Sequence, residues 1–326
     1  MFHRTPLFTV ITLFTFSALQ AAQPTKEQLE DWAKTKSQVI LEFDEQDNLV
    51  RISGTEKRGK GEPLNDADVA VLAQIPTIKV FEWNNPRITA KGVQSIGTME
   101  QLEVLTLWLG GGIDDIDASA ILALDNLKNL RKLDLKHSFS VKGEPVIQTM
   151  TTFPHLQWLT VDTVHSDSEV VEFLQKNPSI TELELHRTQM SNEDFAKVTE
   201  ALPNLVYLEL KPLRRADGIV GNAGLASIKN LAKLQKLTLS HTGWKPLEWE
   251  NGVEHLVDAP SLRLLNTNAV DEFTGSPLEK LAQARPDIAI RTGENVYHEG
   301  KVLDRKEVDF DALTPDVKWE GKNPGR

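Results

Sequence analysis

The chain has 326 residues, of which 40% are hydrophobic and 25% charged, an ordinary composition for a soluble globular protein of one or two domains. Asp and Glu outnumber Lys and Arg by 47 to 36, which gives a formal net charge of -11. Because binding to nucleic acid requires clustered Lys and Arg, this balance argues against a nucleic-acid partner. The chain has no cysteine, so its stability must come from packing without disulfides.

Residues 1–21 differ in character from the rest of the chain. A basic start, "MFHR", is followed by the apolar run "PLFTVITLFTFSAL" and the small-residue stretch "ALQAAQ". This order predicts a secretory signal peptide that is cleaved after Ala21 or Ala22. The alternative is a retained membrane anchor, but the apolar run is shorter than the roughly 20 residues that a spanning helix needs. We therefore expect a secreted or periplasmic protein of the cell envelope, with no stable membrane insertion after cleavage.

Residues 22–63 are predicted to form an N-terminal cap. The stretch "SQVILEFDEQDNLVRISG" contains two apolar runs joined at Asp47 and Asn48, which is typical of a β-hairpin. Such a hairpin would cover the first unit of a repeat array, because an open end would expose apolar side chains and unpaired backbone groups.

A repeat occupies residues 64–291. The pattern Leu-x-x-Leu-x-Leu begins at Leu102, Leu130, Leu205 and Leu234, with slightly altered copies at Leu156 and Ile180 and weaker ones at Ile78 and Leu262. The first positions of successive copies lie 24 to 29 residues apart. Periods of this length are typical of stacked repeat architectures.

The segments between these copies have helical periodicity. In "MSNEDFAKVTEALPN", Phe195, Val198 and Leu202 share one face, and Ser191 with Asp194 forms an aspartate variant of the capping box. Ser166 and Glu169 open "SDSEVVEFLQKNPS" in the same way, and "LNDADVAVLAQIPT", "ITAKGVQSIGTMEQ" and "VGNAGLASIKNLAK" are similar. Each repeat is therefore predicted to be a strand, a turn and a helix, which must stack on its neighbours to bury its apolar side.

These repeats resemble the leucine-rich repeat family, in particular its ribonuclease-inhibitor-like class. The resemblance implies an α/β solenoid with a curved parallel sheet on the concave side, helices on the convex side, and a role in binding other macromolecules. One departure is that the Asn or Cys that usually follows the strand is replaced by Lys136, Asp162, His186 and Lys211. From residue 292 the repeats stop, and residues 292–326 are predicted to be a C-terminal tail, or a cap formed by Val302, Leu303, Phe310 and Trp319.

Strand alternation assigns the polar residues of "SITELELHRT" to the concave face. Leu183 and Leu185 should point into the solenoid, and the residues between them should point outwards. The same register aligns side chains of neighbouring strands in rows, and the rows supply seven candidate partner-binding residues. These are Trp108, Trp158, Glu182, Glu184, His186, Tyr207 and Glu209.

The aromatic candidates are predicted to be exposed binding anchors. Trp158 and Tyr207 should stand two strands apart, roughly 10 Å, with room for a flat ring or an inserted side chain between them. Strand propensity offers an alternative, in which Trp158 and Tyr207 simply cover the methylene groups of neighbouring lysines.

The acidic candidates are predicted to form a solvated face. Glu184 and Glu209 should be cross-strand neighbours, and their repulsion would be relieved by Lys211, Lys236 or a ligand cation. This interpretation is preferred to a catalytic pair, because raised carboxylate pKa values usually require burial. His186, between Asp162 and Lys211, is expected to make binding depend on pH between about pH 5 and 8.

Motifs for cofactor and metal chemistry are incomplete. Gly110 to Gly112 lack a following Lys-Ser or Lys-Thr, so no phosphate loop is predicted. Asp115, Asp117 and Ser119 have calcium-loop spacing but no glycine at the sixth position and no glutamate at the twelfth. The 8 histidines form no His-x-x-x-His pair, and no Gly-x-Ser-x-Gly motif is present. We therefore predict no cofactor and no metal.

The sequence thus predicts a non-enzymatic, exported binding module that recognises a protein or peptide through its concave face. One alternative is a carbohydrate-binding envelope protein that uses Trp108, Trp158 and Tyr207. Another is an enzyme that acts on a glycoside with Glu182, Glu184 and Glu209, for which a deep cleft and one raised carboxylate pKa would be the distinguishing features.

Overall fold

The structure is a computed structural model. It describes residues 23–57, 59–84, 86–108, 116, 118–135, 140–141, 144–145, 147, 150–162, 167–187, 190–211, 221–239, 248–267, 276–293 and 295–313. The predicted signal peptide, the glycines at 110–112 and Trp319 lie outside these ranges, as do Asp115 and Asp117.

The described part of the chain begins with a helix and a β-hairpin that cover the first repeat. Helix α1 (Lys26–Thr35), which the sequence analysis did not identify, starts at a capping box formed by Thr25 and Gln28. It precedes the antiparallel strands β1 (Gln38–Phe43) and β2 (Leu49–Thr55), which form the predicted hairpin. Asp47 has a φ of 60°, in the left-handed region, where the chain turns between them.

A buried carboxylate attaches α1 to the first repeat. Asp68 accepts a hydrogen bond of 2.9 Å from the indole Nε1 of Trp32 and lies 2.9 Å from Lys36 Nζ. Asp68 also closes the capping box of helix α2 (Asp66–Leu72) with Asn65. The Asp68 carboxylate therefore caps the start of α2 and also binds the Trp32 indole of α1 and the Lys36 ammonium that follows α1.

Within the described residues, thirteen strands form one sheet in chain order, apart from β6 and β7. The pairing is parallel from β2 to β13 and antiparallel at both ends. The remaining strands are β3 (Val80–Asn84), β4 (Val104–Trp108), β5 (Lys132–Leu135), β8 (Trp158–Asp162), β9 (Glu182–His186), β10 (Tyr207–Lys211), β11 (Lys236–Leu239), β12 (Leu264–Asn266), β13 (Ala289–Arg291), β14 (Asn295–His298) and β15 (Lys301–Asp304). Strands β6 (Ser140–Val141) and β7 (Glu144–Pro145) form a separate small hairpin.

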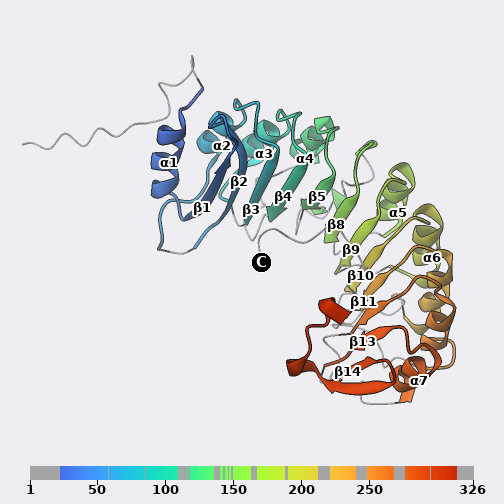
Figure 1. The fold of residues 1–326 in the computed structure, drawn as a ribbon. Coiled ribbons are helices and arrows are strands. Elements are labelled where there is room, and N and C mark those ends of the chain that lie inside the picture. Colours follow the sequence, from blue (N-terminus) through green and yellow to red (C-terminus); the bar gives the residue numbers. More distant parts are fainter. Residues whose placement is uncertain are drawn as a thin grey trace, which may run out of the picture.

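Helical segments lie between most successive parallel strands. They are α2, α3 (Ala90–Ile96), α4 (Ala118–Leu122) with η3 (Ala123–Asn126), α5 (Asp167–Lys176), α6 (Asn192–Ala201), η5 (Asn222–Asn230), η6 (Val253–Asp258) and α7 (Ser276–Ala284), and two short 3₁₀ turns, η7 (Arg305–Glu307) and η8 (Asp311–Leu313), follow the last strand. Figure 1 shows an arc, with the strands along its inner side and the helices along its outer side. The protein is therefore a leucine-rich repeat solenoid, as predicted.

The predicted helices differ in type. Ser191 caps α6 as expected and accepts from the backbone N–H of Asp194, although the Asp194 carboxylate accepts from the Ser191 hydroxyl and not from its backbone. The helix predicted in "VGNAGLASIKNLAK" is present over Asn222–Asn230, but it is the 3₁₀ helix η5 and not an α-helix. Gly221 and Gly224 weaken α-helical preference there, because glycine loses the most backbone freedom in a helix.

The repeat leucines build one continuous core. The side chains at the pattern positions, such as Leu102, Leu105 and Leu107, are 0 to 3% exposed, and their cluster extends from Leu29 to Tyr297. Burial of each leucine contributes about 1.5 to 3 kcal/mol, which compensates for the absence of disulfides. None of the described helices is long and apolar enough to cross a membrane.

The strands β14 and β15 cover the other end of the array. Phe310, which is 3% exposed, packs in a small second cluster with Leu264, Ala289 and Val296. The guanidinium carbon of Arg291 lies 5.0 Å from the centroid of the Phe310 ring. The end of the parallel sheet is therefore covered by residues of the 292–313 segment.

Candidate functional site

The parallel register aligns the concave residues in the predicted rows. Across β8, β9 and β10, Trp158 is opposite Glu182 and Glu182 is opposite Tyr207. The second row contains Thr160, Glu184 and Glu209, and the third contains Asp162, His186 and Lys211. Glu184 and Glu209 are therefore cross-strand neighbours, as expected.

The prediction that Trp158 and Tyr207 are exposed is wrong. Trp158 is 8% exposed and Tyr207 is 4% exposed. Lys132 Nζ lies 4.3 Å from the Trp158 ring centroid, and Lys236 Nζ lies 5.7 Å from that of Tyr207. These contacts agree with the alternative in which the rings pack against lysine side chains and gain cation–π attraction.

Glu182 occupies the strand between the two rings and is itself 7% exposed. The first row, Lys132–Trp158–Glu182–Tyr207–Lys236, is thus a buried layer on the concave side. A ligand inserted between Trp158 and Tyr207 would first have to displace the Glu182 side chain.

Trp108 is the aromatic candidate that remains exposed. It ends strand β4 and is 36% exposed. Strands β5 and β8 lie between β4 and β9, so Trp108 and His186 are three strand spacings apart, about 14 Å. The structure therefore does not bring Trp108 into direct contact with the acidic residues.

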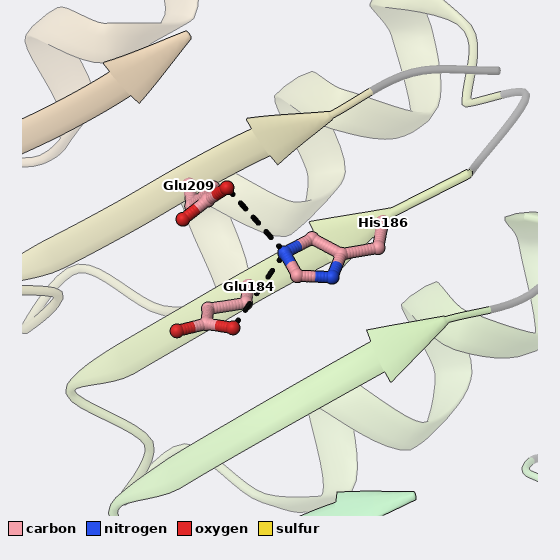
Figure 2. A group of neighbouring side chains, drawn as sticks. All are labelled: Glu184, His186 and Glu209. Atoms are coloured by element: carbon pink, nitrogen blue, oxygen red, sulfur yellow. Dashed lines mark ion pairs between the residues drawn. The ribbon is translucent and has the colours of Figure 1, made fainter. Parts of the chain in front are cut away.

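Glu184, at the centre of β9, His186, at its C-terminal end, and Glu209, at the centre of β10, form a compact cluster. The imidazole Nε2 of His186 lies 3.5 Å from Glu184 Oε2 and 3.5 Å from Glu209 Oε1. Figure 2 shows Nε2 placed between the two carboxylates. The three side chains are only 13 to 18% exposed, so this cluster is partly shielded from water but remains accessible.

Two hydroxyl groups orient the carboxylates. The phenol of Tyr207 donates a hydrogen bond of 2.8 Å to Glu209 Oε2, which is the oxygen not directed at His186. Thr160 Oγ1 donates one of 3.4 Å to Glu184 Oε2. Burial, together with the negative charges of Glu209 and Glu184, raises the pKa of Tyr207 far above its ordinary value, so the phenol remains a neutral donor.

The chain turns sharply after His186. Arg187 has a φ of 51°, and its backbone N–H donates to Lys211 O at 2.6 Å. Its side chain forms an ion pair with Asp162. The register places His186 between Asp162 and Lys211 as predicted, but Asp162 pairs with Arg187, and His186 Nε2 faces the two glutamates.

The cluster can hold a cationic group. Two carboxylates at partial burial repel one another, and a positive charge between them lowers their energy. A protonated imidazole, a Lys or Arg side chain, or a metal ion could supply that charge. All three residues were predicted from the sequence to lie on this face, but the convergence of the two glutamates on Nε2 was not. The sequence pattern that could have predicted this convergence is Glu184-x-His186 on one strand with Glu209 opposite Glu184 on the next.

No protein-family model matches the chain, and no curated protein matches it. Among solved structures, the chain is similar to an internalin (inlF) from Listeria monocytogenes, with 14% identity and a TM-score of 0.38. That similarity covers 85% of this chain and 80% of the internalin chain.

Proposed function

We propose that the protein is an exported, non-enzymatic module that recognises a protein or peptide through the C-terminal ends of its concave strands. The observation that carries this proposal is the partly exposed Glu184–His186–Glu209 cluster on a sheet whose register is fixed by the core below it. A site built from loops loses conformational entropy when binding orders it. This surface lies on a sheet and is already formed, so less entropy is lost on association.

The chemistry of the cluster indicates a basic partner. Its two carboxylates fit a Lys or Arg side chain, and the net charge of -11 would favour the approach of a positively charged segment. Trp108 and Lys211 are exposed in the same outer row. Trp108, three strand spacings from His186, offers apolar area for a more distant part of the partner, whereas Lys211, opposite His186, would favour an acidic group beside the basic one. Trp158, Glu182 and Tyr207, the other three residues predicted to bind, support this surface from the buried layer.

The carbohydrate alternative loses most of its basis. Sugar recognition would use exposed aromatic faces, yet of its three aromatic candidates only Trp108 presents a substantial exposed area. The signal-peptide pattern supports export, which places any partner in the envelope or outside the cell.

The test is affinity capture from envelope and secreted fractions with three forms of the protein as bait. These are the parent, a Glu184→Gln, Glu209→Gln double variant, and Glu200→Gln, which changes an exposed carboxylate on the convex helix α6. A protein captured by the parent and by Glu200→Gln, but lost with the double variant, supports the proposal. Equal capture by all three baits, or loss with Glu200→Gln alone, would place the binding surface elsewhere. A glycan array probed with the same three forms tests the carbohydrate alternative.

A further inference from the structure

The ligand atoms of the Glu184–His186–Glu209 cluster have the composition and spacing of a metal site. One imidazole nitrogen and two carboxylate oxygens all lie within 4.8 Å of one another. They come from two adjacent, directly paired strands, so the sheet holds them in position without any loop. Although the sequence motifs predict no metal, we propose that these three side chains bind a divalent transition-metal ion, with Zn²⁺ as the first candidate.

The distances favour coordination over a hydrogen-bonded cluster. A charged N–H···O hydrogen bond has a length of about 2.8 Å, but Nε2 of His186 is 3.5 Å from the nearest oxygen of each glutamate. Around a tetrahedral zinc ion with bonds of about 2.1 Å, neighbouring ligand atoms are about 3.4 Å apart. The two separations between Nε2 and the glutamate oxygens are therefore close to those between ligands that share one ion, and all three ligand atoms lie within 4.8 Å of one another.

His186 Nε2 provides an independent indication. The atom is inaccessible to solvent and has no hydrogen bond in the described part of the chain. A buried imidazole nitrogen without a hydrogen bond carries a free-energy cost of about 1 to 3 kcal/mol. Coordination to a metal through the nitrogen lone pair would remove that cost.

The surroundings match the outer shell of a metal site. Protein ligands to metals are usually held by further hydrogen bonds that fix their orientation. Tyr207 binds Glu209 Oε2 and leaves Oε1 directed at His186, and Thr160 binds Glu184. Both hydroxyl donors are buried, and Thr160 is 0% exposed, so the carboxylates are oriented before any ion arrives.

The donor set selects the kind of ion. Mg²⁺ and Ca²⁺ prefer sites built entirely of oxygen, whereas an imidazole with carboxylates suits Zn²⁺ and its neighbours in the first transition series. The chain has no cysteine, so thiolates cannot compete for the ion. Three protein ligands leave at least one coordination position for water or for a group from another molecule.

The experiment is a titration of the chelator-treated full-length protein with Zn²⁺ and Co²⁺ salts, followed by calorimetry and, for Co²⁺, by visible absorption. We expect one equivalent to bind and the Tm to rise with ion concentration. His186→Gln and Glu209→Gln should each weaken binding at least about tenfold, because losing a residue that only orients a ligand already costs about 10- to 100-fold and each of these variants removes a ligand itself. The matched control is His155→Gln, which changes an exposed histidine outside the cluster and should bind as the parent does.

Circular dichroism and the metal-free Tm of each variant verify that it is folded. Glu209→Gln is the safer variant, because its amide oxygen can still accept from Tyr207. Absence of one-equivalent binding in the parent, or unchanged affinity in both folded cluster variants, would overturn the inference. The titration needs no partner, so a failure here leaves the proposed binding function standing, and the capture experiment can fail without affecting the metal site.

Discussion

Tyr207 and Glu209 lie two residues apart on strand β10 and are joined by a hydrogen bond of 2.8 Å from the phenol to Oε2. The bond connects the buried first row of the concave face to the accessible acidic cluster in the second. Tyr207 therefore acts on the cluster from within the sheet, although its own ring is almost entirely covered.

Replacing Tyr207 with phenylalanine should separate the two roles of this side chain. The ring and its contact with Lys236 remain, but Glu209 loses its donor. We expect a decrease of about 1.5 to 3 kcal/mol in the free energy of unfolding near pH 7, because a hydrogen bond to a carboxylate is lost. Urea denaturation measures this change. An undiminished stability would show that water replaces the phenol at no cost.

The same variant should change the dependence of stability on alkaline pH. The pKa of Tyr207 is raised in the folded protein above the ordinary value of 10.0. Above about pH 10 the unfolded chain therefore loses a proton that the folded chain retains, and stability falls with rising pH by up to about 1.4 kcal/mol per pH unit. Tyr207→Phe should remove this contribution, so parent and variant should become closer in stability between pH 10 and 11. If the unfolding free energies of parent and variant fell in parallel between pH 10 and 11, the raised pKa of Tyr207 would be contradicted.

Leu185 and Glu184 provide a test of the strand register. Leu185 is 0% exposed in the core, whereas Glu184 faces the concave side. Leu185→Asp buries an unpaired carboxylate and removes a leucine, so we expect it to unfold the central repeats. Glu184→Ala should leave them folded, with a Tm within a few degrees of the parent. Equal losses of Tm in the two variants would mean that the register is wrong.

Gly54 is required by close packing with Trp83 on the neighbouring strand. A Cβ atom at position 54 would lie 2.7 to 2.8 Å from three outer atoms of the indole ring, and Trp83 is 1% exposed. Gly54→Ala should therefore destabilise the protein by about 1 to 3 kcal/mol. The same substitution in a Trp83→Phe background should cost less, because phenylalanine lacks those outer ring atoms. A double-mutant cycle by chemical denaturation measures the difference.

The Asn177 side chain hydrogen-bonds to the backbone of two segments, at Phe153 and at Phe173 in helix α5. The side chain is buried, accepts from Phe153 N at 2.6 Å and donates to Phe173 O at 2.9 Å. Asn177→Ala leaves both backbone groups without these partners, and we expect a loss of about 2 to 4 kcal/mol. The exposed Asn204, changed to alanine, is the control and should cost less than about 0.5 kcal/mol. Thermal and urea unfolding of both variants provide the comparison.

The N-terminal sequence makes a prediction about processing. If residues 1–21 are a signal peptide, mass spectrometry of the exported protein should give a chain that begins at Ala22 or Gln23. Substituting a charged residue into the apolar run, as in Leu13→Arg, should retain the protein in the cell. An exported protein with an intact Met1 would show that the segment is not cleaved.

The sequence by itself determined the architecture and the register. Leucines recurring at intervals of 24 to 29 residues can be buried together only if the units stack, and strand alternation then assigns Glu184 and Glu209 to neighbouring positions on one face. The β-hairpin around Asp47 followed from local turn chemistry. These features depend on residues close together in the chain or on a repeated pattern, which is why they can be read without coordinates.

Only the tertiary structure decided which concave residues are accessible and how their polar atoms converge. The sequence cannot show that Trp158 and Tyr207 are covered, because their burial depends on side chains from strands that are distant in sequence, such as Lys132 and Lys236. Likewise, alternation places His186 on the concave side but leaves its side-chain rotamer open. Packing in three dimensions fixes that rotamer and brings Nε2 to 3.5 Å from both glutamates.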